Sequence, residues 1–226
     1  MSVPLDKVRE DFDCIARLTD GDAEHLAVYD RFLLCQIPRS CHKVLEVGSG
    51  TGAFSRALAV RGHCVTALDL SPEMVRVARA RSAPADGVTY VCGDFFAVAL
   101  DAQAYDCVVS IATLHHMDVG RAFARMAGLI RPGGLLVVHD IRADAGAWDR
   151  LRSVAAVAAR AWTRVCAGRL RERAAVRAAW RDHGQGERYL AMPEVEAWCR
   201  EHAPGARVVR HLQWRYTVVW RKPDAA

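Results

Sequence analysis

Residues 44–52 read Val-Leu-Glu-Val-Gly-Ser-Gly-Thr-Gly, and this stretch decides the fold. Apolar residues around one acid are typical of a short buried strand, and the glycines predict a turn that opens a helix at Ala53. Glycine has no Cβ, so a ligand can approach the backbone and a positive φ costs little. Free N–H groups at the start of the helix would face that ligand. We therefore expect a ligand above the carboxyl end of this strand, where open α/β sheets bind ligands.

Glycine spacing alone does not identify the ligand, because Gly48, Gly50 and Ala53 also satisfy the dinucleotide-binding pattern G-x-G-x-x-A. More information comes from four later segments, each an apolar run of strand length, of which the first two end in Asp69 and Asp94. These segments are 65–69, 88–94, 105–110 and 130–138. We expect Arg-Pro-Gly-Gly at 131–134 to form a tight turn before the last of them.

This succession of motifs, over roughly residues 24–141, resembles the class I S-adenosylmethionine-dependent methyltransferases, in the small-molecule branch of methyltransferase type 11. The resemblance implies an α/β fold with a Rossmann-like, seven-stranded, mostly parallel sheet and a helical lid inserted after strand five. It implies one methyltransferase domain over 1–226. Its parts would be an N-terminal helical cover (1–42), a cofactor-binding core (43–141), a helical lid (142–190), and a last helix with an antiparallel strand pair (191–226).

The resemblance also implies S-adenosylmethionine as the cofactor. Asp94 matches the acid that accepts a hydrogen bond from the adenine amine, and nothing beyond the glycine turn provides for the pyrophosphate of a nicotinamide cofactor. Asp69 would accept hydrogen bonds from the ribose hydroxyls, and Glu46 would lie near the amino end of the methionine moiety, unless it forms a structural ion pair. The remaining expected cofactor contacts are the loop glycines Gly48, Gly50 and Gly52, with Leu70, Met74 and Phe95 around the adenine and Ile111 under the methionine moiety.

The stretch 110–117 contains the candidate catalytic residues His116 and His115. Histidine titrates near neutrality, so either could take a proton from an acceptor hydroxyl or amine, and we slightly favour His116. The alternative is that both only shape the acceptor pocket. Possible substrate contacts are Tyr29 (which could instead be a core aromatic), His139, Asp140 and Trp148. His115, His116, His139 and Asp140 together could bind a metal, but the acid-rich pattern of metal-dependent relatives is missing, so we expect none.

The net charge of +5 is concentrated in one segment, 142–188, which holds eleven arginines and five acidic residues. Its apolar residues recur at helical spacing, so we interpret the arginines as a solvated helix face or as contacts for an anionic acceptor, and we do not expect a nucleic-acid partner. We expect the eight cysteines to be buried reduced thiols, because they form no C-x-x-C pair. No membrane span or signal peptide is recognised, so a cytoplasmic location is expected.

The leading hypothesis is methyl transfer to an O, N or C nucleophile of a small-molecule acceptor. Two alternatives remain: a cyclisation catalysed on the same fold without methylation, and a binding protein that senses the cofactor. The intact glycine loop, with Glu46, Asp69 and Asp94, argues against a degenerate site.

Overall fold

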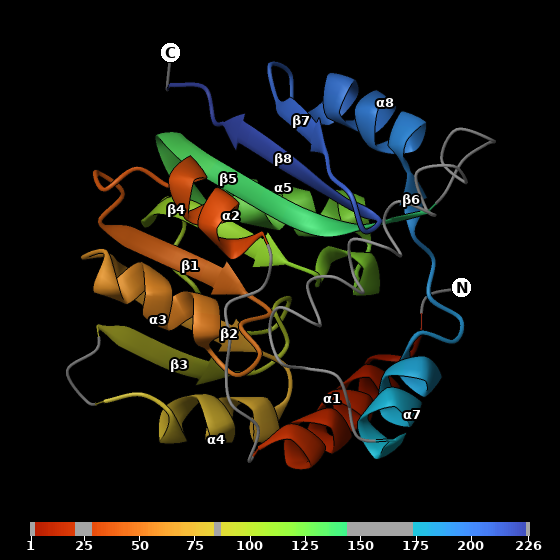
Figure 1. Cartoon of the computed structure of the whole chain (residues 1–226). Coiled ribbons are helices and arrows are strands. Elements are labelled where there is room, and N and C mark those ends of the chain that lie inside the picture. The colour runs from red at the N-terminus through yellow and green to blue at the C-terminus, as the bar shows by residue number, and fades with distance from the viewer. Residues whose placement is uncertain (1–2, 21–28, 84–86, 144–173, 225–226) are drawn as a thin grey trace.

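The computed structural model describes residues 3–20, 29–83, 87–143 and 174–224 (Figure 1). Trp148 and the greater part of the expected lid lie outside the described residues, so the division of the chain at 142–190 stays a prediction. The helices are α1 (Leu5–Thr19), α2 (Asp30–Gln36), α3 (Ala53–Val60), α4 (Pro72–Ala80), the 3-10 helix η1 (Leu114–His116), α5 (Val119–Leu129), α7 (Ala174–His183) and α8 (Met192–His202). None of those α-helices has both the length and the apolar character that a membrane span requires.

The strands form one mixed sheet with the order β3-β2-β1-β4-β5-β8-β7, in which β8 runs antiparallel to β5 and to β7. This confirms the expected fold class. A short strand that the sequence did not predict, β6, pairs in parallel with the end of β5. The strands are β1 (Lys43–Val47), β2 (Cys64–Asp69), β3 (Val88–Cys92), β4 (Tyr105–Ile111), β5 (Ile130–Ala143), β6 (Leu190–Ala191), β7 (Arg207–Arg210) and β8 (Arg215–Arg221).

Two details of strand five differ from the expectation. Residues 131–134 belong to β5 instead of forming a separate turn, and the register with β4 shifts between Tyr105 and Cys107. Gly133, with φ of 69°, lies in this irregular part of the strand. β5 also continues past Asp140 to Ala143, because β8 pairs with it as far as Ile141 and β6 pairs with its last two residues.

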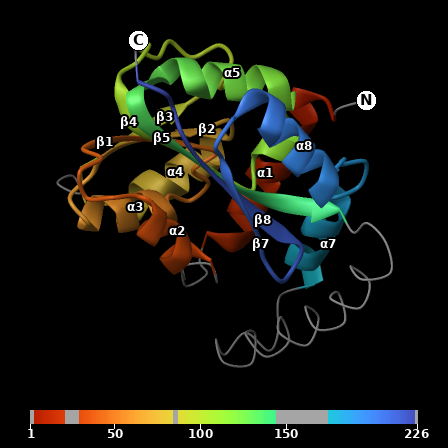
Figure 2. The ribbon, with the colours of Figure 1, turned by 90° about the horizontal axis from the view of Figure 1, so that it is seen from above.

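The sheet is covered on both faces (Figure 2). Neighbouring residues of β1 point to opposite faces of the sheet. Val44 belongs to the core cluster with the side chains of α2, α3 and α4, whereas Leu45 belongs to the cluster with those of α5 and α8. At the end of the sheet to which the parallel strands point, α1 packs against α7 and α4 (Figure 1).

The cysteines within the described residues are free thiols, as expected, but they are not all buried. Cys41, Cys107 and Cys199 are buried, whereas Cys64 and Cys92 are exposed because they occupy the first residue of β2 and the last residue of β3.

Candidate active site

The glycine loop after β1 has the conformation that the sequence predicted. Gly48, Gly50 and Gly52 all have positive φ, at 78°, 53° and 79°. A Cβ at Gly48 would lie 2.0 Å from Thr113 Oγ1, so only glycine allows this approach between the loop and the segment after β4. A Cβ at Gly50 would meet nothing within 4 Å. The loop therefore packs tightly against Thr113, whereas the space beside Gly50 is empty.

Asp69, at the end of β2, holds this loop from the other side. Its Oδ2 accepts a hydrogen bond from the Gly50 N–H at 2.7 Å, and its Oδ1 accepts one from the Ser71 N–H at 2.9 Å. Burial raises the pKa of this carboxyl. Each carboxylate oxygen has a further lone pair, so both remain able to accept a hydroxyl of a ligand at Gly50.

Glu46 lies inside β1, with 2% of its surface exposed, and the Ser55 hydroxyl donates a hydrogen bond to it. Burial and, to a smaller extent, the nearby acids Asp30 and Asp69 together raise its pKa to about 8, against the opposing effect of the Ser55 hydrogen bond. A large share of Glu46 is therefore protonated at neutral pH. A cationic group brought to this carboxyl would favour its ionised form.

The expected adenine contacts lie in different surroundings. Asp94 follows β3 and is half-buried, and its Oδ1 accepts the Phe96 N–H at 2.9 Å. Phe95 is a core side chain with 3% exposed, and the Arg125 guanidinium lies 5.2 Å from its ring centroid. Its ring therefore packs in the core in this structure, and its contact with the cofactor stays a prediction.

The remaining expected cofactor contacts border the same region. Leu70 is half-buried directly after β2, and Met74 is buried against Ile15 and Ala16 of α1. Ile111 is the last residue of β4 and pairs with His139 of β5.

His115 is held by Asp140. Asp140, 1% exposed in β5, accepts the His115 backbone N–H at Oδ2 (2.9 Å), and its Oδ1 lies 2.6 Å from His115 Nδ1. An ionised Asp140 can only accept in this contact, so we assign His115 Nδ1 as the donor. The structure thus brings together one predicted catalytic residue and one predicted substrate contact.

His116 lies close to Glu187 and His183, which the sequence did not assign to the site. Its Nδ1 lies 3.0 Å from Glu187 Oε1, and Glu187 Oε1 lies 3.1 Å from His183 Nε2. Tyr189 donates its hydroxyl proton to Glu187 Oε2. We call His115, His116, Asp140, His183, Glu187 and Tyr189 the polar cluster.

Burial shifts the pKa of His116, whereas direct contacts decide the pKa of Glu187. It lowers the pKa of His116, against the opposing effect of Glu187. Burial raises the pKa of Glu187, but the contacts with His116 and Tyr189 outweigh it and lower the pKa to about 2. We therefore assign a neutral imidazole beside an ionised carboxylate.

The N-terminal helix α1 closes the polar cluster. The Phe12 ring contacts the rings of His183 and His116, with centroids 4.6 and 5.5 Å apart, and His183 Nδ1 lies 3.3 Å from Asp11 Oδ2. No local motif indicated Glu187, Tyr189 or Asp11, because the chain separates them widely from the two histidines. For Glu187 and Tyr189, the only available signal was their polarity near the end of the expected lid.

His139 does not join the polar cluster. Its Nδ1 lies 2.8 Å from Thr217 Oγ1 of β8, and its ring packs on Tyr29 with centroids 5.1 Å apart. Burial lowers its pKa to about 3. Tyr29 donates its hydroxyl proton to the Leu212 carbonyl at 2.5 Å. Successive side chains of a strand point to opposite faces, so His139 and Asp140 cannot share one site.

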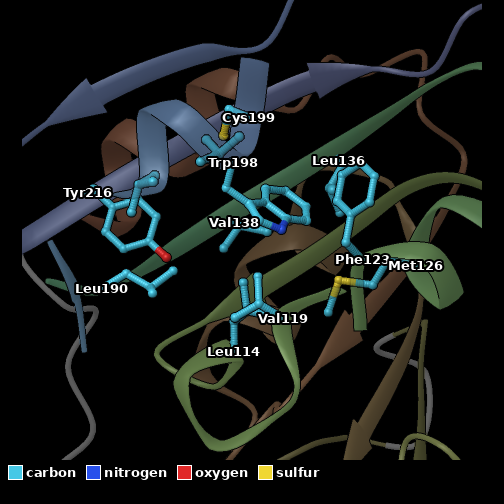
Figure 3. A pocket seen from close by; sticks show the side chains of 12 residues that line it. Leu114, Val119, Phe123, Met126, Leu136, Val138, Leu190, Trp198, Cys199 and Tyr216 are labelled. Carbon is cyan, nitrogen blue, oxygen red and sulfur yellow. The ribbon is translucent and has the colours of Figure 1, made fainter. Parts of the chain in front are cut away.

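A separate apolar pocket lies between the sheet, α5 and α8 (Figure 3). Leu114 and Leu190, next in sequence to His115 and Tyr189, line one part of it. The other lining residues are Val119, Phe123, Met126, Leu136, Val138, Val195, Trp198, Cys199, Tyr216 and Val218.

Comparisons with known proteins bear on the fold and the family of the chain. A family model described as a methyltransferase domain matches residues 45–138. An uncharacterized methyltransferase of Mycobacterium tuberculosis (strain ATCC 25618 / H37Rv) is 31% identical over 202 residues, which cover 86% of this chain and 94% of that protein. A ubiquinone biosynthesis O-methyltransferase of Coxiella burnetii (strain RSA 493 / Nine Mile phase I) is 34% identical over 113 residues, 49% of this chain and 48% of the relative.

Among solved structures, the [4+2]-cyclase SpnF has the same fold, with a TM-score of 0.67 and 14% identity over 99% of this chain and 98% of that one. Identity this low indicates the fold alone. The similarity to the mycobacterial methyltransferase over 86% of this chain, together with the matched family model, shows the family. The chain belongs to the class I S-adenosylmethionine-dependent methyltransferases, and S-adenosylmethionine is its cofactor.

Proposed function

We propose that this enzyme transfers the methyl group of S-adenosylmethionine to an O, N or C nucleophile of a small molecule that binds against the polar cluster. The observation that carries this proposal is the pairing of His115 with Asp140 at the carboxyl ends of β4 and β5. The same segment reaches the glycine loop through the contact of Thr113 with Gly48. Cofactor and acceptor would therefore meet at one edge of the sheet.

In the proposed pose, the cofactor lies along the open side of the glycine loop at Gly50. Asp69 accepts the ribose hydroxyls, Asp94 accepts the adenine amine, and Glu46 lies near the methionine ammonium. Support for this pose comes from the positive φ of the loop glycines, the lone pairs left on Asp69, and the burial of Glu46, which a cation would stabilise in its ionised form. Leu70, Met74, Phe95 and Ile111 would complete the site.

Transfer forms a bond from the acceptor atom to the methyl carbon while the carbon–sulfur bond breaks and its electron pair goes to sulfur. The product is a neutral thioether, S-adenosylhomocysteine. An acceptor hydroxyl or amine must also lose a proton, and we propose that His116 and His115 promote this loss. The remaining rate enhancement comes from positioning, because displacement needs the acceptor atom in line with the carbon–sulfur bond.

The comparisons offer one line of support for a small-molecule acceptor. One curated relative is named for ubiquinone biosynthesis, a pathway of small molecules.

The proposal is tested by measuring S-adenosylhomocysteine formation with separate acceptor pools: small metabolites, RNA and denatured protein. We expect turnover with the small-metabolite pool only. Replacing His115 or His116 by Asn should lower kcat by about 10²- to 10⁴-fold while S-adenosylmethionine still binds. Turnover confined to the RNA or protein pool would refute the small-molecule acceptor. Single variants that both keep kcat within a few-fold would show that the histidines are only walls of the pocket.

A non-methylating cyclase is the second candidate, and the fold of SpnF is the observation behind it. The same assay separates the two reactions. A cyclase would convert its substrate in the presence of S-adenosylmethionine without forming S-adenosylhomocysteine.

A further inference from the structure

Three side chains of the polar cluster converge on one small space. Ligand atoms of His115, His116 and Glu187 all lie within 4.8 Å of one another. His116 Nδ1 is 3.0 Å from Glu187 Oε1, and His115 Nε2 is 3.6 Å from Glu187 Oε2. Two ligands bound to one zinc ion at about 2.1 Å in tetrahedral geometry are roughly 3.4 Å apart. The two separations from Glu187, 3.0 Å to His116 and 3.6 Å to His115, lie on either side of that value.

Three buried polar atoms in this space lack a hydrogen-bond partner. The side chains of His116 and Glu187 are only 7% and 3% exposed. Even so, Nδ1 and Nε2 of His116 and Oε1 of Glu187 are buried without a hydrogen bond of acceptable geometry. Leaving buried polar atoms unpaired is costly. Atoms that are close together but badly aligned for hydrogen bonding are what an ion between them would produce.

The next layer of residues supports the same interpretation. Metal-bound histidines commonly donate their other ring N–H to a carboxylate, and Asp140 Oδ1 lies 2.6 Å from His115 Nδ1. Tyr189 in turn donates to Glu187 Oε2. Among the described residues, no lysine or arginine lies within ion-pair distance of Glu187 or Asp140. A divalent cation would balance these two buried carboxylates.

We propose that His115, His116 and Glu187 bind one divalent transition-metal ion of the zinc type. Two imidazoles and one carboxylate match the ligand set of catalytic zinc sites, in which the fourth position stays open for water or substrate. We place the acceptor oxygen or nitrogen at that position, a step that rests on the proposed function. The ion then lowers the pKa of the acceptor atom, so that water takes its proton, and the two histidines are ligands instead of bases.

Direct metal binding tests this proposal without turnover. The full chain, purified without a histidine tag and stripped with a chelator, is titrated with Zn²⁺ by calorimetry and with Co²⁺ by visible absorption. We expect one ion per chain and Co²⁺ bands of a four- or five-coordinate site. Glu187→Gln and His116→Asn should each weaken binding by about 100-fold or more. Asp140→Asn, which removes an outer partner, should weaken it by about 10- to 100-fold.

The matched control is His202→Ala, since His202 lies on α8 with 42% of its side chain exposed and should not affect binding. Melting temperatures confirm that each variant folds, and if Glu187→Gln does not fold, His116→Asn provides the same test. No uptake by wild-type protein, or equal uptake by Glu187→Gln, would overturn the proposal. Full turnover by stripped, ion-free protein would also overturn it while leaving the proposed function intact. A protein that binds the ion but methylates nothing would refute the proposed function instead.

Discussion

Glu46 should link cofactor binding to pH. Its pKa of about 8 means that roughly a tenth of the free protein carries an ionised Glu46 at pH 7. If the methionine ammonium requires the carboxylate, binding at pH 7 costs about 1.4 kcal/mol, a tenfold loss of affinity. Affinity should therefore rise about tenfold from pH 6 to pH 7. Above about pH 8 it should fall again, because the cofactor's own amine then loses its proton.

Isothermal calorimetry measures this directly. At pH 7, titrations in two buffers with different ionisation enthalpies should show the release of nearly one proton for each S-adenosylmethionine bound. Glu46→Gln keeps the size of the side chain but cannot ionise, so it should bind without proton release and without the pH dependence below neutrality. 5′-Methylthioadenosine, which lacks the amino-acid part, should bind the wild-type protein with no proton release.

The result that would refute this reasoning is binding by the wild-type protein with no net proton release at pH 7. It would mean either that Glu46 is already ionised in the free protein or that it lies too far from the cofactor amine to respond.

Three further predictions follow from the same region. Asp69→Asn should weaken S-adenosylmethionine binding by about 1.5–3 kcal/mol per lost charge-assisted contact, whereas the control Asp106→Asn, at the opposite end of the sheet, should leave the affinity unchanged. Equal affinities of Asp69→Asn and the wild-type protein in calorimetry would place Asp69 outside the site. Gly50→Ala should lower the melting temperature less than Gly48→Ala and should weaken cofactor binding, because its Cβ meets nothing within 4 Å and only its positive φ strains the loop. Gly48→Ala has the same backbone strain and must also force Thr113 away, so the reverse ranking of melting temperatures would contradict the loop geometry. Cofactor-free protein should lose stability as pH rises from about 5 to 8, because Glu46 ionises in the unfolded chain but stays protonated in the folded chain. Urea titrations measure the free energy of unfolding at each pH, and a Glu46→Gln variant with the same pH dependence as the wild-type protein would exclude this cause.

The glycine loop and the parallel strands could be predicted because each depends on a local rule. The Gly-x-Gly-x-Gly run needs positive φ wherever it opens a helix, and short apolar runs that end in Asp69 and Asp94 place those acids at one edge of a parallel sheet. The last helix and the antiparallel strand pair were expected over 191–226 from the family resemblance, and the structure has α8, β7 and β8 in that part of the chain.

The polar cluster could be predicted only in part. His115 and His116 stand out because they follow a buried strand. The partners that orient them are Asp140 and Glu187, which packing brings from distant parts of the chain. Strand alternation also separates His139 from Asp140, although the two are adjacent in sequence. Such pairings depend on tertiary structure and have no spacing rule.

The central claim is methyl transfer to a small molecule, and isotope transfer tests it most directly. S-adenosylmethionine with a deuterated methyl group is incubated with the enzyme and the small-metabolite extract of a strain lacking the gene, in which the unmethylated acceptor should accumulate. We predict that mass spectrometry finds the deuterated methyl group on one low-molecular-weight product with wild-type enzyme, and very much less of it with His116→Asn. Cofactor binding with no label in any small molecule would contradict the account.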